Sequence, residues 1–187
     1  GKRRDARDLT LWKYKNEYTD AVTKHLEDYF GVNSKNGIAG MFGAVSAKCA
    51  RGFWKKYGED VAACTAESRL ESLDGHSLRV RFCDILAYSV CYMILIRCVA
   101  DSEKILSLHV FDCISDFNTP DMTKILGYAV SRAGDLILHQ IAIAVFQYER
   151  EKKQHNGNPE KSNGASAGRN QPEPAGRQER LQAVQDV

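Results

Sequence analysis

Hydrophobic residues recur at helical spacing along most of the chain, most regularly between Asp116 and Lys153. In this stretch, apolar side chains follow one another in steps of three and four residues, which places them on one side of a helix. They are Met122, Leu126, Val130, Ala133, Ile137, Ile141, Ala144 and Tyr148. The pattern predicts one long helix whose apolar side is buried against other helices.

The start of this long helix is marked by Asp116, Asn118, Thr119 and Pro120. Thr119 can accept hydrogen bonds from the first free backbone amides, and Pro120 suits the first helical position because its ring fixes φ. We therefore assign these four residues structural roles in a turn and cap. Two interior glycines, Gly127 and Gly134, each cost about 1 kcal/mol relative to alanine, so we expect a neighbouring backbone to approach closely there. The alternative is that the helix is merely weak at these positions.

Five further helical patterns precede the long one. The first runs from Thr10 to Phe30, carries the apolar row Leu11, Tyr14, Tyr18, Val22, Leu26 and Tyr29, and ends at Gly31. A glycine-rich loop, Asn33–Gly43, leads into a second helix that includes Phe42 to Tyr57 and ends near Gly58. A shorter helix (Val61–Leu73), a central helix capped by Ser77 and a helix from Ser102 to Ile114 follow.

The central helix is apolar nearly all round after Ile85, which is typical of a helix surrounded by others. At the centre of the core we expect Phe82, Ile85, Leu86, Val90, Met93 and Ile94. No stretch shows sustained strand alternation, and no internal repeat is present in the sequence. The sequence predicts an all-α fold: a single orthogonal or bundle-like domain of five to six helices over residues 10–153. Residues 1–9 form a flexible lead-in, and residues 154–187 a disordered tail or linker.

Composition narrows the setting of this domain. The 187 residues carry 26 Lys and Arg against 24 Asp and Glu, a formal net charge of +2, so no global field attracts nucleic acid or an anionic membrane. The six cysteines form no CxxC pair, which favours reduced, buried thiols in the cytoplasm. The most apolar run, Ile85 to Ile96, falls short of the roughly 20 residues needed to span a bilayer. We expect a cytoplasmic protein without membrane contact.

One local cluster of charge is a candidate binding site. Lys48, Arg51, Lys55 and Lys56 lie on the exposed side of the predicted second helix, with Trp54 beside them. Cations with a neighbouring aromatic ring are suited to contact phosphates, so these five residues form a candidate nucleic-acid-binding patch. The alternative is an ordinary solvated helix face.

Catalytic and metal-binding patterns are incomplete. His109 and Cys113 lie one helical turn apart but lack the second pair that a tetrahedral metal site needs. Asp112 and Asp116 could share a proton, although they flank a helix end, where carboxylates commonly accept backbone N–H bonds. The glycine-rich loop lacks the Gly-Lys-Ser/Thr ending of a P-loop. We expect neither a metal nor a cofactor, and no catalysis by this chain alone.

Two stretches of the chain carry a family resemblance. The segments LWKYKNEYTDAVTKHLEDYFG and FDCISDFNTPDMTKILGYAVSRAGDLILHQIAIAVFQYERE resemble an uncharacterised helical segment of very large multidomain proteins of Firmicutes conjugative elements. The matching positions are Leu11, Trp12, Glu17, Glu27, Phe30, Gly31, Asp116, Phe117, Asn118, Thr119, Pro120, Leu126, Gly127, Ala129, Val130 and Ser131. The overlap covers about Leu11 to Lys153, and the glycines at 37, 40 and 43 depart from the family's pattern.

The resemblance implies a context rather than a catalytic residue. In that family the segment follows an antirestriction-like region and precedes helicase-like and adenine-methyltransferase-like regions, none of whose motifs is in this chain. It implies a non-catalytic interaction and spacer domain of a DNA-processing protein of a mobile element. The expected partners are protein domains of the same or a neighbouring mobile-element protein. The alternative is a nucleic-acid-binding accessory module that uses the basic helix face to contact DNA.

Overall fold

The computed structural model describes residues 13–98 and 108–156. Within these ranges the chain forms four α-helices and two 3₁₀ helices, without a strand, so the predicted all-α fold is confirmed. The elements are η1 (Asn16–Tyr18), α1 (Thr19–Phe30), α2 (Gly37–Ala63), α3 (Gly75–Cys98), η3 (Leu108–Asp116) and α4 (Pro120–Asn156).

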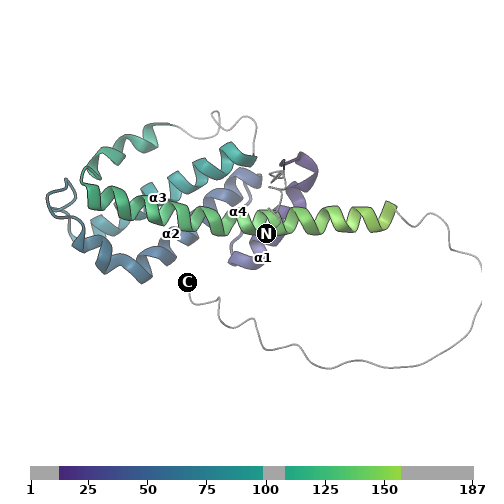
Figure 1. Cartoon of the computed structure of the whole chain (residues 1–187), viewed down its shortest axis with the longest axis horizontal. Helices are drawn as coiled ribbons and strands as arrows, with labels where there is room; N and C mark the ends of the chain where they lie inside the picture. Colours follow the sequence, from purple (N-terminus) through teal and green to yellow (C-terminus); the bar gives the residue numbers. More distant parts are fainter. Residues whose placement is uncertain (1–12, 99–107, 157–187) are drawn as a thin grey trace, which may run out of the picture.

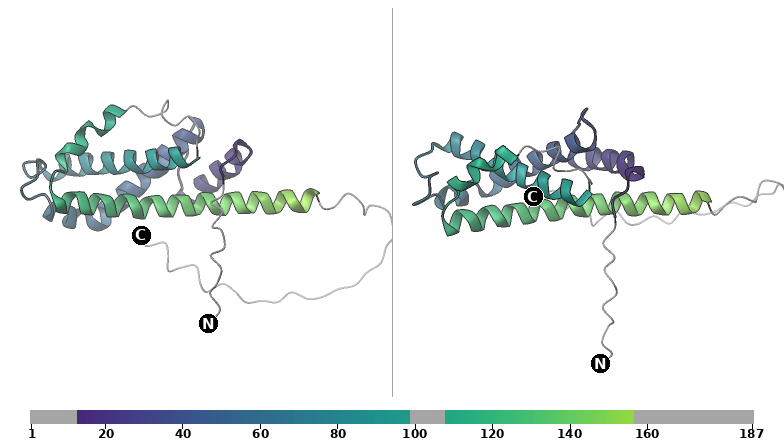
Figure 2. Two further views of the ribbon diagram at one scale, coloured as in Figure 1. Left: turned by 45° about the horizontal axis from the view of Figure 1, so that its top comes forward. Right: turned by 90° about the horizontal axis from the view of Figure 1, so that it is seen from above.

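Helix α4 is the element on which the others assemble. It is 37 residues long and runs along the length of the described molecule (Figure 1). Helices α2 and α3 lie beside its first half, and α1 lies beside its second half (Figure 2). The last turns of α4 project beyond the other helices in every view. One helix therefore connects two packing regions.

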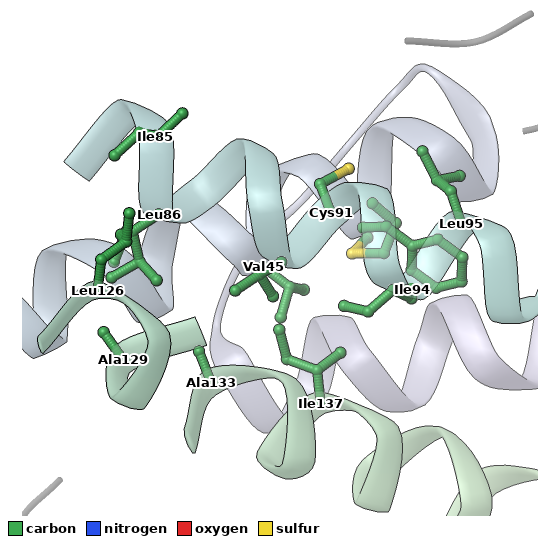
Figure 3. Close-up of a cluster of buried hydrophobic side chains, with 14 of the residues drawn as sticks. Val45, Ile85, Leu86, Cys91, Ile94, Leu95, Leu126, Ala129, Ala133 and Ile137 are labelled. Atoms are coloured by element: carbon green, nitrogen blue, oxygen red, sulfur yellow. The ribbon is translucent and has the colours of Figure 1, made fainter. Parts of the chain in front are cut away.

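The core follows the predicted apolar patterns closely. On α4, the residues Met122, Leu126, Ala133, Ile137, Ile141 and Ala144 are buried, while Val130 and Tyr148 are half-buried at the edge. On α3, the expected central residues Phe82, Ile85, Leu86, Val90 and Ile94 are fully buried, and Met93 is half-buried. Leu126 and Ile137 of α4 point toward α3 and α2 (Figure 3). Each fully buried aliphatic side chain stabilises the fold by about 1.5–3 kcal/mol.

The first helix of the structure is shorter than the helix predicted from Thr10 to Phe30. Lys15 has extended backbone angles (φ −126°, ψ 149°), a single 3₁₀ turn follows, and α1 begins only at Thr19. Ring contacts fix the positions of Tyr14 and Tyr18. The Tyr18 ring lies edge-on to the rings of Tyr14 and Tyr148, with ring centroids 6.1 Å and 5.5 Å apart. Gly31 ends the helix as predicted, with φ 60° and its N–H bonded to the Glu27 carbonyl at 2.9 Å. Tyr29 was expected in the apolar row but is 46% exposed.

Helix α2 is longer than predicted at both ends. It begins at Gly37, so Gly40 and Gly43 are helical rather than parts of a loop. A Cβ at Gly40 would meet the Asn36 Cβ at 2.6 Å, and glycine therefore permits this tight first turn. Gly58 does not end the helix, because the Trp54 ring packs directly over it, about 3.0 Å from the position of a Cβ. This packing offsets the low helix propensity of glycine.

The connection between α2 and α3 differs from the prediction in two ways. Residues 64–73 form successive turns rather than the predicted helix Val61–Leu73, and Leu70 within them is buried in the core. The cap of α3 is Asp74, not Ser77: Asp74 Oδ1 accepts from the backbone N–H groups of His76 (2.9 Å) and Ser77 (3.0 Å). An ionised carboxylate at this position also interacts favourably with the helix dipole.

The remaining boundaries differ by smaller amounts. Residues 108–116 form a 3₁₀ helix in place of the predicted α-helix to Ile114, and the proposed cap Ser102 lies outside the described residues. Helix α4 ends at Asn156, three residues beyond the predicted end at Lys153. The predicted lead-in and most of the predicted tail lie outside the described ranges.

The two interior glycines of α4 have different environments. A Cβ at Gly134 would collide with the terminal methyl of Met93, so this glycine makes room for a side chain of α3 rather than for its backbone. The expectation for Gly127 was wrong, because a Cβ there would meet nothing within 4 Å. Gly127 is exposed and only lowers the helix propensity of this turn.

This difference predicts opposite outcomes for one substitution at two positions. Gly127→Ala should raise the free energy of unfolding by roughly 0.5–1 kcal/mol, since alanine favours the helix and finds open space. Gly134→Ala should give no such gain, because Met93 must move. Chemical denaturation of both variants is the measurement, and an equal gain at the two positions would contradict the packing of Met93.

Candidate functional site

The predicted basic residues lie on one exposed face in the middle of α2. Lys48, Arg51, Lys55 and Lys56 are all exposed, and the first three follow in steps of three and four residues. We call these four residues the α2 basic face. Residues at such spacing are neighbours on a helix surface, so the first three cations form a row, and the exposed Lys56 follows Lys55 at its edge.

Trp54 does not belong to the accessible part of this face. Its ring is half-buried, packs over Gly58 and lies 6.0 Å from the ring of Phe82 in the core. Lys55 follows Trp54 in the sequence and faces solvent, whereas the Trp54 ring packs toward α3. Trp54 therefore anchors α2 to α3 and does not belong to the candidate binding residues.

A further cation joins this surface from α3. Arg79 is exposed, and the half-buried Cys83 follows it by one helical turn. Burial raises the pKa of the Cys83 thiol; the charge of Arg79 lowers it, that of Asp84 raises it and that of Arg51 lowers it. The thiol of Cys83 donates to the carbonyl of Ala50 at 3.7 Å, which joins α3 to α2 at this point. Arg51 follows Ala50 and Arg79 lies one turn before Cys83, so the two cations flank the same seam, together with the carboxylate of Asp84.

An aromatic cluster borders the other side of the α2 basic face. Its members are Phe53 and Tyr57 of α2 and Tyr128 of α4, with ring centroids 4.7 Å apart for Phe53–Tyr57 and 6.3 Å apart for Phe53–Tyr128. The Lys56 ammonium lies 5.4 Å from the centre of the Tyr57 ring. Tyr128 remains 50% exposed. The sequence pattern alone places Phe53 and Tyr57 in the apolar line of their helix and does not relate them to Tyr128.

The predicted turn before α4 has the expected structural roles. The hydroxyl of Thr119 accepts a hydrogen bond from the N–H of Met122 at 3.3 Å, as an N-cap should. The side-chain oxygen of Asn118 accepts from the N–H of Arg69 at 3.1 Å and so ties the turn to the α2–α3 connection. The carboxylate of Asp116 forms an ion pair with Arg81 of α3, at 3.8 Å. Pro120 is the first residue of α4.

The side of α4 that faces away from the core is unusually apolar between residues 136 and 146. Phe146 is 66% exposed, and Leu136 and Ile143 are half-buried on the same outer side. Among the described residues, α4 is also the one helix long and apolar enough to cross a membrane, with a mean hydropathy of 1.3 over an 18-residue window. The opposite side of that window is buried by α1, α2 and α3, as in a core helix. Length and composition alone therefore do not make α4 a membrane span.

A polar network fixes the second half of α4 to the start of the described chain. The hydroxyl of Tyr18 donates to Glu149 at 2.6 Å, and the ammonium of Lys152 donates to Glu17 at 2.6 Å. The hydrogen bond from Tyr18 lowers the pKa of Glu149, and the bond from Lys152 lowers that of Glu17. Burial, and then the Glu149 carboxylate, raise the pKa of the Tyr18 phenol, which therefore remains a neutral donor.

A second hydrogen bond supports the same region. His25 of α1 and the buried Gln140 of α4 are joined at 2.9 Å between the His25 Nε2 and the Gln140 Oε1. This contact gives a buried amide oxygen the partner that burial requires. It also fixes the position of α1 along α4.

The remaining polar features of the described residues are a groove on α3 and the cysteine thiols. A groove of about 490 Å³ runs between α3 and η3 and is lined by His76, Ser77, Val80, Arg81, Asp84, Tyr88 and Cys113. Within the described ranges, no three His, Cys, Asp or Glu residues lie close enough together to hold a metal, and for His109 the structure describes only the backbone. Burial raises the pKa of the Cys49 and Cys91 thiols to about 11 and that of Cys98 to about 12. These thiols are protonated at neutral pH, which makes them poor nucleophiles.

The cap of α4 predicts a stability effect. Thr119→Ala should lower the free energy of unfolding by about 1 kcal/mol, because the N–H of Met122 loses its side-chain acceptor. Ser131→Ala, at an exposed position inside the same helix, is the control and should cause no loss. An unchanged stability of the Thr119 variant would show that the cap is dispensable.

The network at Tyr18 predicts a dependence on pH. The pKa values of Glu17 and Glu149 lie below the ordinary value of 4.5, so their stabilising effect is fully present above that pH and is lost as the pH falls through the lowered values. As the pH falls below 4.5, the native chain should lose stability more steeply than a Glu17→Gln, Glu149→Gln double variant. Equal slopes in pH-dependent denaturation would contradict this role, and Glu151→Gln controls for loss of an exposed carboxylate.

Comparisons with other proteins give no family for this chain. Searches of protein-family models, curated proteins and solved structures found no match. Its function is therefore argued from the surfaces described above.

Proposed function

We propose that this chain is a non-catalytic helical interaction and spacer domain. The observation that carries this proposal is the outer side of α4, where Phe146 is 66% exposed and the half-buried Ile143 and Leu136 lie three and ten residues before it. Exposed aromatic residues next to other apolar side chains are typical anchors of protein–protein interfaces. A partner helix could bind along this side of α4 by the spacing of its own apolar residues.

The dimensions of α4 support the spacer role. A helix of 37 residues spans about 55 Å at 1.5 Å per residue. Its first half is braced by α2 and α3 and its second half by α1 and η1. Such a braced helix can hold the segments before and after it at a fixed separation.

The use of polar residues supports a non-catalytic role. Asp74 and Thr119 cap helices, Asn118 ties a turn to the α2–α3 connection, and Tyr18 with Glu149 joins η1 to α4. These side chains hold the fold together rather than converge in one apolar cavity. We further propose that the domain acts in the cytoplasm as part of a DNA-processing protein of a mobile element, on the resemblance given by Leu11 to Lys153.

Nucleic-acid binding is the second candidate function. It is favoured by one specific observation, the addition of Arg79 of α3 to the four cations of the α2 basic face. Five cations on adjacent helices form a local positive surface on a chain whose net charge is only +2. Such a local surface can contact phosphates although the whole chain is nearly neutral.

Site-specific cross-linking tests the interaction function. A photoreactive benzoylphenylalanine at position 146, introduced into the full chain in cells, should form a discrete cross-linked product with a partner protein identifiable by mass spectrometry. The same probe in place of Tyr29, which is 46% exposed on α1, is the control and should give several-fold less product. Absence of a product at 146 in a folded variant, or the same products at both positions, would refute the proposed surface.

A further inference from the structure

A long stretch of the chain without acidic residues underlies the positive surface of α2. Between Asp28 and Glu59 there are five basic residues and no Asp or Glu: Lys35, Lys48, Arg51, Lys55 and Lys56. In the rest of the chain the 24 acidic residues outnumber the remaining 21 basic ones, since the whole chain has 26 basic residues. Segregation of charge on one helix gives this surface a field that the net charge conceals.

The geometry of the α2 basic face matches a linear polyanion. Lys48, Arg51 and Lys55 form a row along the helix, and the first and last are about 10.5 Å apart at 1.5 Å rise per residue. A stacked nucleic-acid strand carries a phosphate about every 3.4 Å, so the row is about as long as three nucleotides. Arg79 adds a cation from α3, one turn before Cys83, whose thiol contacts the carbonyl of Ala50 beside Arg51.

The aromatic cluster adjoins the α2 basic face, so it is in a position to contact the bases of a strand whose phosphates lie on that face. Lys56 connects the two regions, because it belongs to the basic face and its ammonium lies 5.4 Å from the centre of the Tyr57 ring. Tyr128 is half exposed and is braced from α2 by the edge of Phe53 at 6.3 Å. A braced, exposed ring can stack on an unpaired base, whereas the bases of a duplex are already stacked on each other.

We propose that the α2 basic face, together with Arg79 and the aromatic cluster, binds single-stranded nucleic acid. The cations contact successive phosphates, and Tyr128 stacks on a base of the same strand. This inference rests on the second candidate function and deepens it by naming the kind of nucleic acid. Glu59 and Asp60 follow Lys56 by three and four residues and limit the positive row at that end.

Fluorescence anisotropy with the full chain tests the inference. The probes are a labelled 12-nucleotide oligothymidylate and a labelled 12-base-pair duplex, each titrated at 50 and 200 mM salt. For three to four contacted phosphates, the affinity for the single strand should fall by about 20- to 50-fold over this range, given a slope of about −0.7 per phosphate. At each salt concentration, the single strand should bind several-fold more tightly than the duplex.

Matched variants separate the contributions of charge and stacking. Lys55→Glu should weaken binding and reduce the salt dependence, while Lys24→Glu on α1 makes the same charge change at an exposed position away from the surface and should have little effect. Tyr128→Ala should weaken single-strand binding by at least about 5-fold without changing the salt slope. Because the three positions are exposed, circular dichroism melting should show that each variant is folded.

The outcomes distinguish the inference from the function on which it rests. No binding at 50 mM salt, or equal effects of Lys24→Glu and Lys55→Glu, would overturn both the surface and nucleic-acid binding by it. Duplex binding as tight as single-strand binding, with Tyr128→Ala silent, would overturn the assignment of single strands and leave phosphate binding by the α2 basic face in place.

Discussion

The burial of one side of α4 is the constraint on which the rest of the structure depends. From Met122 to Ala144, the inner side of this helix supplies the surface against which α1, α2 and α3 pack. Isolated helices are marginal in water, and their stability in proteins comes mainly from such packing. Gly134 shows how closely the fit is made, since the methyl group of Met93 occupies the space in which any larger residue would place its Cβ.

Local hydrogen bonds decide where the packed helices begin and end. Asp74 caps α3, Thr119 caps α4, and Gly31 ends α1 in a left-handed conformation that suits glycine. Asn118 lies beside the cap of α4 and also makes a tertiary contact. Its side-chain oxygen accepts from the N–H of Arg69 and so holds the start of α4 against the α2–α3 connection. The same few residues therefore set helix boundaries, and Asn118 also holds the start of α4 in contact with a distant part of the chain.

The two surfaces with the strongest physical character lie at different levels of α4. Tyr128 borders the α2 basic face, and Phe146 lies 18 residues further along the helix, about 27 Å away at 1.5 Å per residue. That separation allows a protein partner at Phe146 and a polyanion near Tyr128 to be bound together. A rigid helix between them would fix their relative position, which is how a spacer domain and a nucleic-acid-binding module could be one and the same.

The sequence by itself determined the helical class, the buried side of α4 and the caps at Thr119 and Gly31, because periodicity and capping chemistry are local properties. It also placed the cations of the α2 basic face on one exposed side. Only the tertiary structure decided that Trp54 faces the core and that α2 continues through Gly58, since a ring packed over a glycine offsets a weak propensity. Tertiary packing likewise placed Tyr128 of α4 against Phe53, and Cys83 of α3 against Ala50, the residue before Arg51. The proximity of residues from different helices has no signature in sequence spacing.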